Sequence, residues 1–324
     1  MILIISEPQD VHAQAVMRAL AAQGERNVRL LDFTDFPQRL TTTMAIGGGV
    51  PSEYALTFSD RRVPMREVKS VWWRRPQAFG LPQGLDPVAR HFAMTEAATA
   101  FQGMWQASDC LWVNDIQRDA AAAHKPWQLE LAQSLGLSIP ETLITNEPED
   151  ARAFWQTHPG EVIYKPFIQS WHSWRETRIL RKEEEALAPL VRLAPVIFQR
   201  YVPGHADLRV TVIGEEVFPA AAALADGEYP VDVRLNKVPY KPHRLPPEVT
   251  ERLLVMMRRL GLEYGAIDLR LTPDGEYVFF EVNPAGQFLY IEMATGQPIA
   301  AALASRLAQG RAAAKGVSPL RAAA

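Results

Sequence analysis

A β-hairpin near the C-terminal end constrains the fold more than any other part of this chain. Residues 264–288 read YGAIDLRLTPDGEYVFFEVNPAGQF, two apolar runs on either side of Thr-Pro-Asp-Gly. Proline and glycine stand where a tight turn favours them, so the segment predicts two antiparallel strands. With one face fully apolar, the pair must form the centre of a sheet and not an isolated ribbon.

The polar residues of this hairpin are predicted to share one sheet face. If the turn pairs Leu271 with Glu276, Asp268 faces Phe279, and alternation puts Asp268, Glu281 and Asn283 together. Asp268 and Glu281 would then be diagonal neighbours, about 7–8 Å apart. Two carboxylates on such a face need a positive partner. Hard oxygen ligands indicate Mg²⁺, which on a sheet usually accompanies a nucleotide phosphate; the alternative is a solvated face with two scattered acids.

Composition excludes several classes of function. The 324 residues carry a net charge of −3, which gives no bias toward nucleic acid or a membrane surface. The single cysteine, Cys110, rules out an internal disulfide framework and suits a reducing cytoplasm. The opening MILIIS has neither a basic flank nor a cleavage site, so it predicts a first strand and not a signal peptide. No stretch is long and apolar enough to span a bilayer.

Patterning along the chain predicts an α+β protein with three lobes. Residues 1–118 open as strand, helix and strand, an α/β unit that lacks a G-x-G-x-x-G turn. Residues 119–198 alternate helix and strand in a small central lobe. Residues 199–310 contain mainly antiparallel strands with hairpin-length connections. The Ala-rich segment 311–324 is expected to be a disordered tail.

Two lysines stand in unusual places. Lys165 lies in the apolar strand EVIYKPF, where it either binds an anion or extends its stem along a sheet edge to solvent. Lys125 opens a helix, where a cation opposes the helix dipole. That placement hints at an anionic partner, although exposed lysines also occur there.

The segment Gln199-Arg200-Tyr201-Val202 is a strand that runs into Pro203-Gly204. Such a segment can present backbone N–H and C=O groups to the edge of an adenine. It can equally serve as a simple linker between two lobes.

Two Asp-x-Arg segments follow the linker, Asp207-Leu208-Arg209 and Asp232-Val233-Arg234. In each, the acid and the arginine share one strand face. A guanidinium meets two phosphate oxygens at once, so Arg209 and Arg234 suit a transferring phosphoryl group. The alternative is two surface ion pairs of little energetic value.

Aromatic residues near arginines indicate a third kind of site. Trp72-Trp73-Arg74-Arg75 ends a strand of the first lobe. It either forms a platform for a peptide or anion, or consists of one buried and one rim tryptophan with solvated arginines. The loop after Lys165 contains Trp171 and Trp174, and we expect it to be mobile. The histidines lack metal-ligand spacing, which argues against zinc hydrolases.

Taken in order, these signals resemble the ATP-grasp superfamily over roughly residues 119–307. The resemblance rests on the helix-opening lysine, the strand lysine, QRYV, DLRV, and the final D…EVNP. It implies two lobes that close on ATP and a reaction that passes through an acyl phosphate. It also implies ATP and Mg²⁺ as cofactors. Lys125 and Lys165 would bind the ATP phosphates, the segment Gln199, Arg200, Tyr201 and Val202 would form the hinge around the adenine, and Asp207 would lie near the ribose or the hinge. The magnesium ligands would be Asp268, Glu281 and Asn283, and the catalytic residues would be Lys165, Arg209 and Arg234.

Within that superfamily the chain is most similar to the graspetide or microviridin-type peptide maturases, on the strength of VWWRRP, VND and EVNPAGQFLYIE. This implies a cytoplasmic ligase that joins Asp or Glu side chains of a precursor peptide, with a leader and an acidic core, to Ser, Thr or Lys. Trp72, Trp73, Arg74, Arg75, Trp171 and Trp174 are the candidates for contacting that peptide. The alternatives are a small-molecule ligase akin to glutathione synthetase and an ATP-binding module without catalysis. A homodimer is compatible with the sequence, and no general base stands out.

Overall fold

The computed structural model describes residues 1–49, 51–167, 178–224 and 238–310. The chain divides into two compact units, and it passes between them more than once. Of the described residues, the first unit contains those within 1–119, 262–264 and 298–310, and the second contains those within 120–261 and 265–297. The final helix therefore groups with the N-terminal unit, whereas the division into three lobes and a tail stays a prediction.

A four-stranded parallel sheet, ordered β2-β1-β6-β7, forms the centre of the first unit. Strand β1 is fully buried along its length, because helices cover both faces of a parallel sheet. Asp10 and Asp86 cap α1 and α2 by accepting from backbone amides, as expected of an N-cap aspartate. A three-stranded antiparallel sheet adjoins it, ordered β3-β4-β5. The bounds are β1 (Ile2–Ile5), α1 (Val11–Ala22), β2 (Val28–Leu31), η1 (Phe33–Asp35), β3 (Leu40–Ala45), β4 (Glu53–Phe58), β5 (Arg62–Pro64), η2 (Met65–Glu67), β6 (Ser70–Trp73), α2 (Pro87–Gln106), β7 (Leu111–Val113), α3 (Ile116–Ala122) and α8 (Ile299–Gln309).

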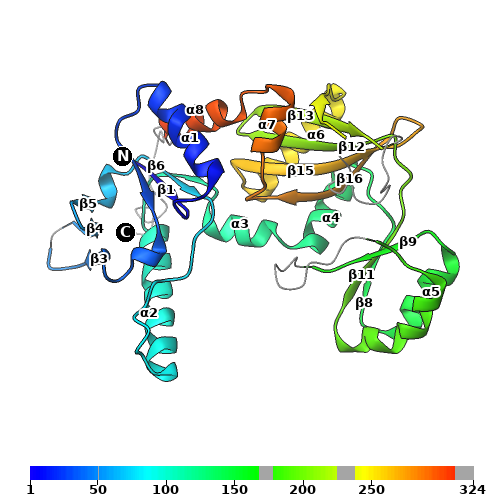
Figure 1. Ribbon diagram of the computed structural model, residues 1–324, viewed down its shortest axis with the longest axis horizontal. Helices are drawn as coiled ribbons and strands as arrows, with labels where there is room; N and C mark the ends of the chain where they lie inside the picture. Colours follow the sequence, from blue (N-terminus) through cyan, green and yellow to red (C-terminus); the bar gives the residue numbers. More distant parts are fainter. Residues whose placement is uncertain (50, 168–177, 225–237, 311–324) are drawn as a thin grey trace. The chain divides into compact units, whose positions relative to one another are not determined.

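Helices α1 and α8 lie side by side in this unit (Figure 1), and Gln23 Nε2 donates to the carbonyl of Ala301 at 3.0 Å. The predicted opening of strand, helix and strand is confirmed. Within the described residues, no helix is both long and apolar enough to cross a bilayer.

A smaller antiparallel sheet, ordered β10-β9-β11-β8, begins the second unit. One face packs on α5 and η3 through Trp155, Val162, Val191 and Phe198. Alternation turns Lys165 and Gln199 to the other face. The bounds are α4 (Lys125–Ser134), β8 (Thr142–Thr145), α5 (Pro148–Thr157), β9 (Val162–Lys165), β10 (Arg178–Ile179), η3 (Lys182–Leu193) and β11 (Val196–Arg200).

The larger sheet of the second unit has five strands, ordered β14-β13-β12-β15-β16. Helix α6 ends at Gly261, which adopts the left-handed conformation (φ 70°) typical of a glycine that closes a helix. Helix α4 runs along the edge strand β16. The bounds are β12 (Ala206–Ile213), β13 (Glu216–Ala223), β14 (Lys241–Pro242), α6 (Pro247–Leu260), β15 (Tyr264–Leu271), β16 (Tyr277–Asn283) and α7 (Leu289–Thr295).

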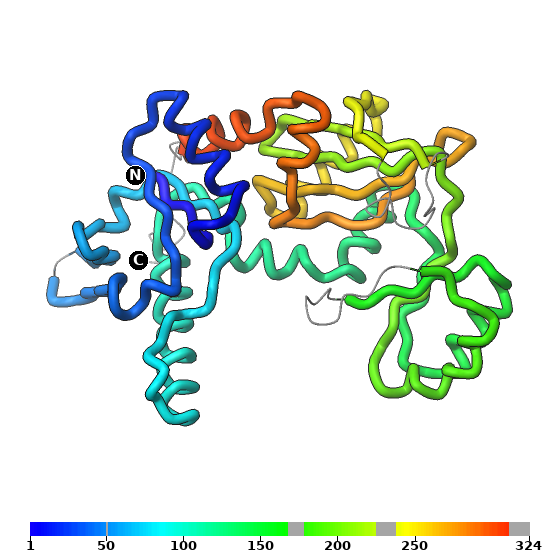
Figure 2. Tube along the Cα trace, viewed as in Figure 1, coloured from blue at the N-terminus to red at the C-terminus, as the bar shows by residue number. Residues whose placement is uncertain are grey.

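The predicted hairpin exists as β15 and β16 (Figure 2), but the predicted register is wrong. Leu271 pairs with Tyr277, because Gly275 takes a positive φ of 90° and adds a residue to the turn. A β-bulge between Asp268 and Leu269 then shifts the register again, so that Asp268 faces Glu281 directly. A bulge commonly re-aims side chains beside an active site. The two carboxylates are therefore direct cross-strand neighbours and not diagonal ones.

Candidate active site

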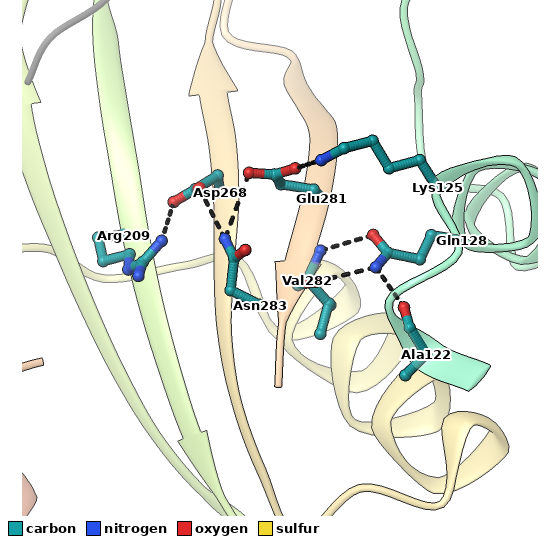
Figure 3. A network of polar contacts seen from close by, with 8 residues as sticks. All are labelled: Ala122, Lys125, Gln128, Arg209, Asp268, Glu281, Val282 and Asn283. Carbon is teal, nitrogen blue, oxygen red and sulfur yellow. Dashed lines mark hydrogen bonds and ion pairs between the residues drawn. The ribbon is translucent and has the colours of Figure 1, made fainter. Parts of the chain in front are cut away.

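Three oxygen-bearing side chains converge where β15 and β16 pair (Figure 3). Asp268 and Glu281 face each other across the ladder, and Asn283 lies two residues beyond Glu281 on the same face. Asn283 Nδ2 lies 3.3 Å from Asp268 Oδ2 and 3.3 Å from Glu281 Oε1. The structure thus brings together the three residues predicted as metal ligands, although through a register that the sequence did not predict.

Each carboxylate has a cation beside it. Lys125, the first residue of α4, contacts Glu281 through its ammonium group. Arg209 Nη1 donates to Asp268 Oδ1 at 2.7 Å, and its Nη2 donates to the carbonyl of Gln287 at 3.3 Å. Both pairs are largely shielded from solvent, with the Arg209 side chain only 10% exposed. A buried carboxylate needs such compensation to remain ionised.

Lys165 on β9 adds a third positive charge near this pair. Burial lowers its pKa to about 8, while Glu281 and Asp268 oppose the shift and Lys125 adds to it. Burial would raise the pKa of Glu281, but Lys125 and Lys165 outweigh it and hold that pKa well below the usual value. Three cations against two carboxylates leave a surplus of one positive charge, which favours an anionic ligand.

The donor set fits magnesium. Within the described ranges no group of three or more His, Cys, Asp or Glu side chains gathers, so the donors here are two carboxylates and one amide. Mg²⁺ is typically held by one or two carboxylates, with water and substrate phosphates completing its shell. Asp268, Glu281 and Asn283 meet that requirement, and the neighbouring lysines suit the phosphates.

Gln128 is a supporting residue that the sequence reasoning missed. It is 2% exposed, and its side chain bonds both backbone groups of Val282, at 2.8 Å from the amide nitrogen and 2.9 Å from the carbonyl oxygen. The amide group also donates to the carbonyl of Ala122. Gln128 follows Lys125 by three residues, so both project from one face of α4. The spacing K-x-x-Q before a strand Glu was the available signal.

Gly286 is a second supporting residue that was missed. A Cβ at this position would stand 2.4 Å from Ala266 Cβ and 2.8 Å from Arg209 Nη2. Only glycine therefore lets the loop after β16 approach the arginine that bonds Asp268. The motif NPAGQ contains that glycine, but a close approach between distant segments leaves no mark in the sequence.

The predicted adenine hinge connects β11 to β12. Gln199 is fully buried, its Nε2 donates to Thr142 Oγ1 at 2.8 Å, and its Oε1 has no partner among the described residues. Arg200 differs, because its side chain is 54% exposed and pairs with Glu161 at 3.2 Å. Arg200 and Glu161 both line a cavity of about 510 Å³ together with Tyr201 and Val202, and the contact of Arg200 with a nucleotide stays a prediction.

Asp207 is held by an arginine of the neighbouring strand β15. Both of its carboxylate oxygens accept from Arg270, at 2.6 and 2.9 Å, in a pair that is nearly buried. Arg270 was also missed, because DLR in β15 reads as an ordinary sheet pattern. The geometry ties Asp207 to the hinge, which was one of its two predicted locations.

The prediction of an exposed tryptophan and arginine platform is wrong for Trp72 and Arg74. Each is 2% exposed: Trp72 lies in β6, an inner strand of the parallel sheet, and Arg74 follows directly after that strand. Arg74 Nε donates to the buried Asp10 at 3.1 Å. Trp73 packs partly into the core of the first unit, and Arg75 is partly exposed, so their contact with a peptide stays a prediction. Arg234, Trp171 and Trp174 lie outside the described residues.

Comparisons with known proteins give a consistent result. Residues 1–120 match the MvdD pre-ATP grasp domain and residues 122–307 match the RimK-like ATP-grasp domain. The macrocyclase MdnC bound with precursor peptide MdnA, from Microcystis aeruginosa MRC, is 29% identical, with a TM-score of 0.83 over 95% of this chain and 99% of that one. The macrocyclase MdnB from the same organism is 30% identical, with a TM-score of 0.79 over 94% and 98%.

A curated relative matches part of the chain. Human N-acetylaspartylglutamate synthase A is 25% identical over 57% of this chain and 49% of its own length. The chain thus spans about half the length of the curated relatives it matches. The RimK-like model covers more than half of the sequence, and the ATP-grasp fold predicted from the lysines, QRYV, DLRV and EVNP is confirmed. This chain belongs to the RimK-like ATP-grasp family.

Proposed function

We propose that this chain is an ATP-dependent ligase that macrocyclises a ribosomally made precursor peptide. The bonds formed are esters or amides between Asp or Glu side chains and Ser, Thr or Lys side chains of that peptide. The observation that carries the proposal is the cluster of Asp268, Glu281 and Asn283 held between Lys125, Lys165 and Arg209. The likeness to a macrocyclase bound with its precursor peptide supports the peptide as substrate.

In this proposal Asp268, Glu281 and Asn283 hold Mg²⁺, which when bound offsets the negative charge of the ATP phosphates. Lys125 and Lys165 bind phosphate oxygens. Gln199 offers its buried, unpaired Oε1 near the hinge as an acceptor for the adenine amino group. Arg200, Tyr201 and Val202 contribute hinge backbone.

The first step forms a bond between a peptide carboxylate oxygen and the γ-phosphorus of ATP, with ADP leaving. Negative charge spreads over the transferring oxygens, and Lys165 and Arg209 stabilise it. Arg209 is positioned for this by its bonds to Asp268 and to the Gln287 carbonyl. Arg234 is proposed as a second arginine at the same phosphoryl group.

The second step forms the ring. A Ser or Thr hydroxyl, or a Lys amine, of the same peptide attacks the acyl carbon, the carbon–oxygen bond to phosphate breaks, and inorganic phosphate leaves with its electron pair. The proton of the attacking group is released to phosphate or water. Because both groups belong to one bound peptide, the reaction gains the advantage of an intramolecular step.

A small-molecule ligase is the second candidate, favoured by the likeness to N-acetylaspartylglutamate synthase A. The test is to incubate the chain with ATP, Mg²⁺ and an acidic peptide encoded next to it. Masses reduced by multiples of one water, with matching ADP release, are expected from a macrocyclase. ADP release with amino acids or small carboxylates, and an unchanged peptide mass, would replace the proposal by the second candidate. Nucleotide binding without turnover on either substrate class would indicate a module without catalysis.

A further inference from the structure

A nearly buried ion pair lies where the hinge enters the five-stranded sheet. Arg270 of β15 donates from Nε to Asp207 Oδ1 at 2.6 Å and from Nη2 to Asp207 Oδ2 at 2.9 Å. The side chains are 4% and 14% exposed. Two parallel bonds between a guanidinium and a carboxylate make the strongest and most directional kind of ion pair.

The same guanidinium also binds the hinge itself. Arg270 Nη1 donates to the carbonyl oxygen of Val202 at 2.9 Å. Its Cζ lies 5.9 Å from the ring centre of Tyr201 and 5.4 Å from that of Phe280, within the range of a cation–π contact. One side chain thus joins β12, β15, β16 and the hinge.

The chain around Gly204 leaves no room for this contact to shift. A Cβ on Gly204 would lie 2.7 Å from Arg270 Cδ and 2.4 Å from Leu224 Cδ1. One residue later, the amide of His205 donates to the carbonyl of Leu271 at 2.7 Å. The hinge is therefore fastened to the end of β15 at Val202 and again at His205.

The pair also shares a sheet face with the candidate metal ligands. Arg270 lies two residues after Asp268 on β15, and Asp207 lies two residues before Arg209 on the neighbouring strand β12. Alternation puts all four on one face. Arg209–Asp268 and Arg270–Asp207 therefore form two crossed pairs, one at the candidate metal ligands and one at the hinge.

We propose that the Asp207–Arg270 ion pair fixes the position of the hinge backbone relative to the candidate metal ligands. In this proposal Asp207 is a positioning residue and not a ribose ligand. The inference rests on the proposed function, because it concerns the nucleotide site of that reaction. A turn of the Asp207 carboxylate toward a ribose would strip Arg270 of its counter-charge in a buried position, which is strongly unfavourable. Asp207 therefore acts on the nucleotide only through Arg270 and Val202.

The test compares Asp207→Asn and Arg270→Lys with the wild type for Mg²⁺-dependent binding of ADP, 2′-deoxy-ADP and 3′-deoxy-ADP by calorimetry. Each substitution keeps a polar side chain of similar size but breaks the two-bond geometry. We expect both to raise the Kd for all three nucleotides by the same factor, about tenfold. The double variant is expected to bind each nucleotide only slightly more weakly than either single variant, because each single substitution already breaks the same ion pair. An Asp207→Asn loss that disappears with either deoxynucleotide would show a ribose contact and overturn the proposal.

Hydrogen exchange without nucleotide separates this proposal from the proposed function. In both variants the backbone amides of Tyr201, Val202, Gly204 and His205 should exchange faster than in the wild type. Arg258→Gln, which removes the two solvent-exposed ion pairs of Arg258 with Glu215 and Glu251, should leave those amides unchanged. Unaltered exchange in Asp207→Asn and Arg270→Lys would overturn the proposal that this ion pair fixes the hinge backbone. A wild type that binds no ADP would refute the proposed function, while the exchange result would still decide whether the pair fixes the hinge.

Discussion

Gln128→Leu tests whether helix α4 holds the edge of the active-site strand. Gln128 supplies a donor and an acceptor to the two backbone groups of Val282, in a position that is 2% exposed. Leucine has nearly the same volume but satisfies neither group. The backbone N–H and C=O of Val282 would then be buried without partners.

The expected loss of stability follows from these two unsatisfied backbone groups of Val282. Each unsatisfied polar group costs about 1–3 kcal/mol, so the two together predict a loss of roughly 2–6 kcal/mol in the free energy of unfolding of the second unit. For a unit of this size, that corresponds to a fall in Tm of about 5–15 °C. The neighbouring Glu281 would also no longer be held at a fixed distance from Lys125. The KM for ATP should therefore increase in the same variant.

The assay is differential scanning calorimetry with and without Mg²⁺ and ADP, together with urea unfolding followed by circular dichroism. Gln133→Leu is the matched control, because Gln133 is exposed on the same helix and its substitution should change stability by less than about 0.5 kcal/mol. A Gln128→Leu protein as stable as the Gln133→Leu protein would refute the account of the bond to Val282.

Three further predictions concern the site directly. Arg209→Ala should lower kcat by about 100-fold or more while ADP binding is largely kept, as measured by coupled ADP release and calorimetry; turnover near the wild-type rate would remove Arg209 from the reaction. Because the pKa of Lys165 is lowered to about 8, its positive charge is present below that pH and lost above it, so kcat/KM for ATP should fall as pH rises through about 8. Lys165→Arg, if active, should abolish that alkaline fall, and an unchanged pH profile would contradict the assignment. Gly286→Ala should destabilise the protein by about 1–3 kcal/mol through overpacking against Ala266 and Arg209, whereas Gly84→Ala, which meets open space, should be neutral in thermal unfolding.

Local patterns in the sequence were enough to predict the chemical groups of the site. Two apolar strands around Pro273 and Gly275 identified the hairpin, and period-two alternation placed Glu281 and Asn283 on one face. The order of Lys125, Lys165, the hinge and the hairpin identified the family. These features depend on residues close together in the chain, for which the backbone has few conformations.

Two predictions show where local reasoning reaches its limit. The positive φ of Gly275 and the bulge at Asp268 moved the register by one residue and then another, and turn chemistry alone permits either loop length. Trp72 and Arg74 had the composition of a binding platform but are buried, Trp72 in the inner strand β6 and Arg74 just after it, because burial depends on which helices cover the sheet. No pattern within five residues contains that information.

The sequence by itself determined the elements, the family and the identity of the acids, amide and cations that face one another. Only the tertiary structure decided their partners, since these contacts join residues far apart in the chain: Lys125 with Glu281, Arg209 with Asp268, Gln128 with Val282, and Arg270 with both Asp207 and the hinge. The physical reason is that a buried charge or amide must be matched wherever folding leaves it, and the matching group is selected by distance in space. The hairpin therefore supplies the ligands, and the helix and strands packed around it determine how they are held.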